Sequence, residues 1–207
     1  MITTRITGID GTKILMRTEL SAALHDLHRK SPRSANTRMN LAIFRLAVCC
    51  GLRVSEIGGL RLGDIRLSRP RPHIRIPRGA AKGGKPRTVP LWWDAGTLAD
   101  LTAWKAERQE EGAADEDVLI ASRRHGGPLS RHTLRKRFIT ACRCLGQTRL
   151  QTLTIHHGRH TFISHALAGG RTLAEVRDAA GHANVSITSG YLHVAIDEDE
   201  EAGHLFG

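Results

Sequence analysis

Apolar residues recur at helical spacing along most of this chain, and this period constrains the fold more than any other feature of the sequence. Helices are predicted over about residues 19–28, from near Ser34 to Gly51, and over about 94–109, 130–145, 156–168, 172–180 and 186–196. Strand-like alternation is confined to residues 60–67, 73–77 and 87–91, and the last two segments suit a hairpin. A chain of 207 residues has room for one good-sized core. The sequence therefore predicts a mainly α domain with a small antiparallel β-sheet, an α+β fold.

Composition divides the chain into three parts. Residues 1–17 have no clear period and are expected to be an N-terminal arm or a residual linker. Residues 18–196 are expected to form the folded domain, with Thr18 capping its first helix. Residues 197–207 begin with consecutive acids, which is typical of a solvated, frayed tail.

The unusual feature of the composition is its charge. The chain has 31 Lys and Arg against 20 Asp and Glu, a net charge of +11 and a pI near 10.5. Because the tail concentrates several of the acids, the rest of the chain is still more basic. Each cation placed beside a phosphate releases counterions that are condensed on a nucleic acid, so this excess favours DNA or RNA as the partner.

Two patterns suggest a nucleotide or a metal, and neither is complete. The segment Gly79 to Lys85 has the spacing of a phosphate-binding loop, but Pro86 stands where Ser or Thr must hold magnesium. Four histidines fall on one predicted helix: His156, His157, His160 and His165. They lack the intervening glutamate of a zinc protease helix, and an arginine stands among them. The sequence predicts no cofactor and no metal.

The cysteines and the N-terminus indicate the compartment. The cysteines have neither the spacing of a metal finger nor that of a disulfide framework, and are expected to be reduced and mostly buried: Cys49, Cys50, Cys142 and Cys144. The N-terminus lacks a basic segment followed by an apolar one, and the longest apolar stretch is bracketed by arginines. We therefore expect a soluble, cytoplasmic, nucleoid-associated protein with no membrane partner.

Five short signals carry candidate chemistry. They are Gly51-Leu52-Arg53-Val54-Ser55-Glu56, Lys82 at the predicted hairpin tip, His156-x-x-Arg159, Gly181-His182, and Tyr191, the only tyrosine of the chain. Each signal alone has an ordinary structural interpretation, such as a surface cation, a buried histidine or a packed ring. Their order and spacing are specific.

In this order the signals resemble those of the tyrosine recombinase family, the phage-type integrases, over residues 18–195. The segment Gly51 to Glu56 is identical to the family's first box, Gly-Leu-Arg-(Ile/Val)-Ser-Glu. The second box is similar to His156 to Phe162, and the third to Gly181-His182 with a tyrosine nine positions later. Lys82 matches the family's hairpin lysine. The resemblance implies the fold of the family's catalytic domain, and the cleavage and rejoining of DNA strands.

The resemblance also implies a role for the nucleophile and the arginines. Tyr191 would attack a DNA phosphate and form a 3′-phosphotyrosyl link. A free tyrosine has a pKa near 10, so the phenol needs help at neutral pH. Arg53 and Arg159 would hold non-bridging oxygens of the phosphate and stabilise the charge that builds up in the transition state.

Four further residues receive roles from the resemblance. His156 would take the tyrosine proton or bond the phosphate, and His182 would donate to a phosphate oxygen. Lys82 would act as the general acid that protonates the departing 5′ oxygen. Glu56 would orient an arginine and take no part in the chemistry.

The chain departs from the family pattern at Gly158 and Ala180, where leucine is usual. A glycine within a helix predicts a kink or a close backbone approach. The family's DNA-embracing N-terminal domain has no room in this chain. The family also implies a homotetramer on paired sites of double-stranded DNA, with Leu205 and Phe206 of the tail docking on a neighbouring protomer. The main hypothesis is a site-specific recombinase or integrase, and the alternatives are a type IB topoisomerase-like relaxing enzyme and a catalytically silent DNA-binding accessory protein.

Overall fold

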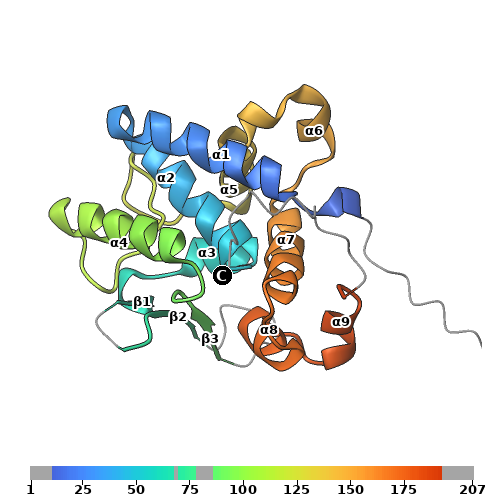
Figure 1. The fold of residues 1–207 in the computed structure, drawn as a ribbon. Helices are drawn as coiled ribbons and strands as arrows, with labels where there is room; N and C mark the ends of the chain where they lie inside the picture. The colour runs from blue at the N-terminus through green and yellow to red at the C-terminus, as the bar shows by residue number, and fades with distance from the viewer. Residues whose placement is uncertain (1–10, 68–69, 78–85, 193–207) are drawn as a thin grey trace, which may run out of the picture.

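The computed structural model describes residues 11–67, 70–77 and 86–192 (Figure 1). Lys82, the predicted hairpin tip around it, the acidic tail and its Leu205 and Phe206 lie outside the described residues. The helices are α1 (Arg17–Lys30), α2 (Ala35–Phe44), α3 (Val54–Gly59), α4 (Ala95–Glu110), α5 (Arg131–Ala141), α6 (Gln147–Thr152), α7 (Ile155–Ala168), α8 (Leu173–Ala180) and α9 (Val185–Ser189). Single helical turns are η1 (Gly11–Lys13), η2 (Ser31–Arg33), η3 (Arg45–Cys49), η4 (Leu62–Asp64) and η5 (Arg143–Leu145).

One antiparallel sheet accompanies the helices, in the order β1 (Ile65–Arg66), β2 (His73–Ile76) and β3 (Arg87–Pro90). The register pairs Ile74 with Val89, and both side chains are buried. The segments predicted as a hairpin are therefore confirmed, and β1 lies inside the alternating segment before them. The predicted class, mainly α with a small antiparallel sheet, is confirmed.

The second helix differs from the prediction. Ser34 begins α2 by accepting a hydrogen bond from the backbone N–H of Thr37, but the α-helix gives way to the π-helical turn η3. Gly51, at a φ of 63°, then ends the segment. A Cβ on Gly158 of α7 would lie 2.9 Å from the carbonyl carbon of Ala47 in η3. The close backbone approach predicted at Gly158 is thus present, and it sets α7 directly against η3.

Three predicted helix ends were wrong. Helix α1 begins one residue before Thr18, because Glu19 accepts a hydrogen bond from the backbone of Met16 and makes Met16 the cap. The helix predicted to reach residue 145 ends at Ala141, and a glycine at a φ of 84° separates it from α6. The last predicted helix ends at Ser189, so Tyr191 lies in the turn that follows.

Two clusters of buried apolar residues form the core. The larger one joins α1, α2, η3, α4, α5 and the sheet. The smaller one joins α7 and α8, and it includes Trp93, Phe162 and Tyr191. In Figure 1, α8 and α9 lie beyond one end of α7, away from α1 and α6. Ile14 and Leu15, which were expected in the N-terminal arm, are fully buried, and the backbone of Leu15 bonds Thr161 and His165 of α7.

Two smaller features complete the fold. All four cysteines are free; Cys49, Cys50 and Cys142 are buried, and Cys144 is exposed. Burial raises the pKa of each buried thiol. No helix within residues 11–67, 70–77 and 86–192 is long and apolar enough to cross a membrane.

Candidate active site

The first motif forms the start of α3. Arg53 occupies the cap position, and Glu56 accepts its backbone N–H at 2.8 Å and its guanidinium Nη1 at 3.1 Å. The Glu56 carboxylate is buried, whereas 35% of the Arg53 side chain is exposed. Burial by itself raises the pKa of Glu56, but hydrogen bonds and charge from Arg87 and Arg53 lower it overall. Glu56 therefore stays ionised and holds the backbone N–H and one guanidinium nitrogen of Arg53, while 35% of that side chain remains exposed to solvent.

Arg159 of α7 joins the first motif to the third. Its Nη1 donates to the carbonyl oxygen of Gly51 at 2.9 Å, and its Nη2 donates to that of Ala180 at 2.5 Å. These bonds use two of the five N–H groups of the guanidinium. Only 4% of Arg159 is exposed, and among the described residues it forms no salt bridge with a carboxylate. Burial, followed by the charges of Arg53 and Arg87, lowers the pKa of Arg159 to about 10. A buried cation is thus held beside other cations without an anion of its own.

Tyr191 lies in the smaller core with 6% of its surface exposed. Its hydroxyl is 2.7 Å from Nδ1 of His160, one helical step from Arg159 on α7. Burial raises the pKa of Tyr191, and the nearby Arg159 offsets part of that rise. Burial, followed by His156 and His157, lowers the pKa of His160 to about 4, so the imidazole is neutral at neutral pH. The Nδ1 atom can therefore accept the phenolic O–H.

His182 follows the C-terminal end of α8. Gly181 ends this helix in the left-handed conformation, at a φ of 68°, which a glycine adopts without strain. The His182 ring lies 6.3 Å from that of Tyr191, and its Nδ1 is 2.9 Å from the Thr188 hydroxyl. Burial, followed by Arg159 and Arg53, lowers the pKa of His182 to about 4.

His156 completes the histidine group. Its ring centroid lies 5.1 Å from that of His160, edge to face. Burial, followed by Arg159 and Arg53, lowers its pKa. The hydroxyl of Tyr191 bonds His160, whereas His156 was expected either to take the tyrosine proton or to bond the phosphate.

The structure thus brings together the expected residues that it describes: Arg53, Glu56, His156, Arg159, His182 and Tyr191. His160 and Arg87 also contact these residues; from the sequence, His160 was considered only as a possible metal ligand and Arg87 was given no functional role. His160 stands one helical turn after His156, so their shared face was a usable signal. Arg87 belongs to none of the motifs. The only indication of it was that a buried carboxylate such as Glu56 requires a cationic partner.

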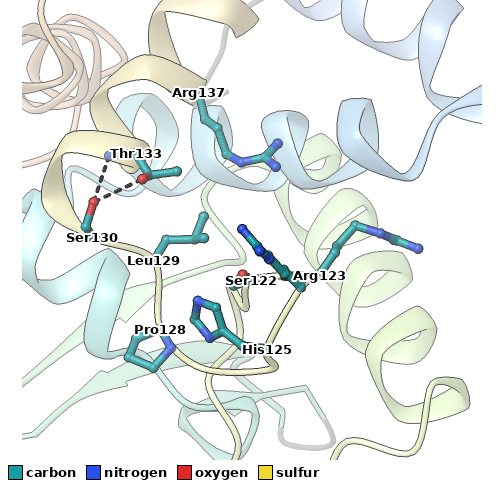
Figure 2. Close-up of a pocket in the computed structure, with 9 residues that line it drawn as sticks. Ser122, Arg123, His125, Pro128, Leu129, Ser130, Thr133 and Arg137 are labelled. Atoms are coloured by element: carbon teal, nitrogen blue, oxygen red, sulfur yellow. Dashed lines mark hydrogen bonds between the residues drawn. The ribbon is translucent and has the colours of Figure 1, made fainter.

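A second cationic site lies where α5 begins (Figure 2). A pocket of about 450 Å³ is lined there by Ser122, Arg123, Arg124, His125, Pro128, Leu129, Ser130, Thr133 and Arg137. Arg137 bonds the amide oxygens of Asn40 and Asn36, and burial together with the charge of Arg123 lowers its pKa. Arg123 pairs with Glu111 at 3.5 Å, whereas Arg124 and Arg137 form no salt bridge within the part of the chain that the structure describes, so the pocket keeps an excess of positive charge. No group of His, Cys, Asp and Glu within the described parts of the chain is arranged to hold a metal ion.

Comparisons with known proteins give a consistent result. The model of the phage integrase family matches residues 13–198. A tyrosine recombinase of Pseudothermotoga lettingae is 30% identical over 202 residues, which cover 95% of this chain and 64% of the relative. Tyrosine recombinase XerC of Chromobacterium violaceum is 34% identical over 189 residues, covering 91% of this chain and 55% of the relative. The chain thus spans only part of the length of these relatives.

Solved structures agree with the sequence comparisons. The crystal structure of the XerH site-specific recombinase bound to its difH substrate, a pre-cleavage complex, superposes with a TM-score of 0.69 at 25% identity. The match covers 90% of this chain and 51% of that one. The curated relatives named above are tyrosine recombinases. Because the family model spans nearly all of the described residues, motifs included, this chain belongs to the phage integrase family.

Proposed function

We propose that this chain is the catalytic part of a site-specific DNA recombinase or integrase, which cleaves and rejoins DNA strands through a 3′-phosphotyrosyl link at Tyr191. The observation that carries the proposal is Arg159. Its guanidinium is buried next to Arg53 and Tyr191, and its hydrogen-bond partners among the described residues are two backbone carbonyls. A buried cation without a paired carboxylate is costly unless an external anion completes the site. A DNA phosphate is an anion of the right charge and shape for two guanidinium forks.

The contacts suggest how the first step proceeds. Arg53 and Arg159 hold the non-bridging oxygens of the scissile phosphate, and His182 donates to one of them. Tyr191 attacks the phosphorus while its proton passes to the neutral His160, whose Nδ1 already lies 2.7 Å from the hydroxyl. The bond to the 5′ oxygen breaks, and that oxygen leaves with a proton. We assign this proton to Lys82, as the family resemblance implies.

The second step is the reverse of the first. The 3′-phosphotyrosyl link keeps the energy of the phosphodiester, so the 5′ hydroxyl of another strand can attack it and release Tyr191. The phenol then recovers its proton from His160, and the proton of the attacking 5′ hydroxyl returns to Lys82, as the family resemblance implies. Because the energy is conserved in the link, this scheme needs no ATP, and the arginines supply the charge that stabilises both transition states.

The partner is proposed to be double-stranded DNA, bound as a tetramer on paired sites in the nucleoid. The basic pocket at the start of α5 supports contact with further backbone phosphates, since Arg123, Arg124 and Arg137 supply positive charge there. The XerH structure, which is a complex with its difH substrate, supports the same partner.

The test is a covalent trapping experiment on DNA of random sequence. The chain is incubated with duplexes that carry a randomised segment and a nick, so that the short 5′-hydroxyl fragment dissociates after cleavage. We expect adducts that survive denaturing detergent, share one DNA sequence and disappear in Tyr191→Phe. Tyr191→Phe should still bind the recovered duplex in a mobility-shift assay. Adducts that persist in this variant, or no adducts with either protein, would contradict the proposal.

A second assay separates recombination from DNA relaxation. Two labelled duplexes that contain the recovered sequence are mixed with the wild-type chain. Strand exchange between them supports a recombinase. Relaxation of a supercoiled plasmid without any exchange would replace that function by a type IB topoisomerase-like one.

A further inference from the structure

Glu56 lies between two arginines, and they bind it unequally. Arg87 of β3 donates through Nη1 and Nη2 to both carboxylate oxygens, at 2.6 and 2.8 Å. Arg53 makes a single side-chain bond of 3.1 Å to one of these oxygens. The Arg87 side chain is 7% exposed and that of Arg53 is 35% exposed. The charge of Glu56 is thus met mainly by Arg87, from the buried side.

Arg87 also contacts the third motif. Its Nε donates to the carbonyl oxygen of Ala179 at 2.9 Å, and Arg159 takes the next carbonyl, that of Ala180. Cations at the last carbonyls of a helix are favourable, because these groups lack partners within the helix. A Cβ on Gly181 would lie 2.7 Å from Cδ of Arg87, so the side chain passes directly under this glycine. Arg87 therefore connects Glu56 to the helix end from which His182 projects.

These contacts decide what Arg53 can do. A buried, ionised carboxylate needs strong charged partners. If Arg87 did not satisfy both oxygens, Glu56 would draw the Arg53 fork into a two-bond pair of its own. An arginine held in this way has fewer N–H groups left for a phosphate. Lysine cannot take the place of Arg87. Its single ammonium lacks the separated donors with which the guanidinium bonds two carboxylate oxygens and a carbonyl oxygen at once.

We propose that Arg87 is a positioning residue of this active site, which occupies Glu56 so that Arg53 stays available to the scissile phosphate and which fixes the end of α8 that carries His182. The inference rests on the proposed function for its catalytic consequence. Its structural part concerns the position of Arg53 and is measurable without catalysis.

The first experiment compares Arg87→Lys with Arg45→Lys. Arg45 is an equally buried arginine bound to Asp94 and Asp100, so it controls for the general cost of replacing a buried arginine by lysine. The rate of single-turnover cleavage is measured on the duplex recovered in the trapping experiment. The DNA concentration is saturating, and the temperature is well below the melting temperature of each variant. We expect Arg87→Lys to cleave about 100-fold more slowly, the order expected for a misplaced catalytic contact, with little change in DNA affinity. Equal rates for the two variants would overturn the proposal.

A double-mutant cycle identifies Glu56 as the link. Glu56→Gln removes the charge that Arg87 is proposed to hold, while keeping the shape of the side chain. In that background Arg87→Lys should slow cleavage further by much less than 100-fold, because no carboxylate remains to draw Arg53 inward. Effects that multiply in full would show that Arg87 acts independently of Glu56, and would overturn the proposed role.

The second readout needs no DNA. Phenylglyoxal modifies accessible guanidinium groups, and mass spectrometry reports the rate at each arginine. We expect Arg53 to be modified more slowly in Arg87→Lys than in the wild type and in Arg45→Lys, because Glu56 then holds its fork. An unchanged rate at Arg53 would overturn the proposal. A chain that forms no adduct but shows this protection would contradict the proposed function while leaving the contact between Arg87, Glu56 and Arg53 supported.

Discussion

Arg45 and Arg159 are buried to the same extent, yet their surroundings are opposite. Arg45, in the larger core, pairs with Asp94 at 3.1 Å and Asp100 at 2.7 Å. Burial lowers its pKa, but Cys49 and these carboxylates more than offset that effect and raise it overall. Arg159, beside the smaller core, bonds two backbone carbonyls and stands near other arginines, and its pKa is about 10.

The difference separates a structural arginine from one prepared for a ligand. A buried ion pair that is complete within the chain needs nothing from outside, and removing either partner leaves an uncompensated charge. An arginine that is held by backbone carbonyls is fixed in position, and its positive charge remains unpaired because the carbonyl groups are neutral. Arg159 therefore has the properties needed to bind an anion that arrives with the substrate, while Arg45 holds α2 and η3 to α4.

The largest expected effect follows from replacing Arg159. Arg159→Met keeps much of the side-chain volume and removes the guanidinium from the phosphate. We expect the single-turnover rate of adduct formation to fall by about 1,000-fold or more, the order found when one preorganised donor to a developing charge is lost. A rate that falls less than tenfold would mean that Arg159 is not the main residue that stabilises the transition state. The rate of Arg53→Met, measured in the same assay, would then show whether Arg53 has that role.

The matching change in the larger core should act on stability instead. Arg45→Met leaves Asp94 and Asp100, whose side chains are only 13% and 15% exposed, without this cation, and we expect it to lower the free energy of unfolding by about 3–5 kcal/mol. Arg159→Met should cost less, because its removal also relieves repulsion from Arg53 and Arg87. Urea denaturation of both variants measures this. If Arg159→Met proved the more destabilising of the two, the distinction between the arginines would fail.

The fold was predictable from the sequence where local rules decide it. Ser34 and Gly51 marked the limits of a helical segment, and the strands flanking the predicted hairpin were recognisable by their alternation. The π-helical turn η3 was not predictable, because it depends on how α7 approaches across the core. Met16 replaced Thr18 as a cap because Glu19 is placed to bond its backbone.

The site was predictable only as far as its motifs extend. Spacing identified Arg53, Arg159, His182 and Tyr191, which the fold brings together. Arg87 is 31 positions from Glu56, and the tertiary fold, which no local pattern reveals, makes them neighbours. His160 meets Tyr191 because the chain turns after α9, and no local pattern fixes that turn.

Gly158 sets the distance between α7 and η3, and so between Arg159 and Gly51. A methyl group there would meet the Ala47 backbone at 2.9 Å, so we expect Gly158→Ala to lower stability by about 1–3 kcal/mol, as overpacking does. Cleavage should also slow, since Arg159 is the next residue. Gly59→Ala is the control, because no heavy atom beyond its chain neighbours and its own helix backbone lies within 4 Å of its added Cβ. Equal stability of the two variants, measured by thermal melting, would contradict the close approach.

The smallest expected effect is on the pH dependence of stability, because His160 and His182 are only half-buried and solvent screens part of their shift. Their pKa values fall from 6.5 to about 4 in the folded chain, so between these values the unfolded chain binds more protons. The contribution of these two histidines to the free energy of unfolding should therefore be fully present above pH 6.5 and be lost as the pH falls toward 4. Urea midpoints across this window measure the decline, and the His160→Gln/His182→Gln double variant should show a shallower one. Parallel curves for the two proteins would mean that burial and the neighbouring cations do not lower the pKa of these rings, and that the contrast with Arg45 is confined to the arginines themselves.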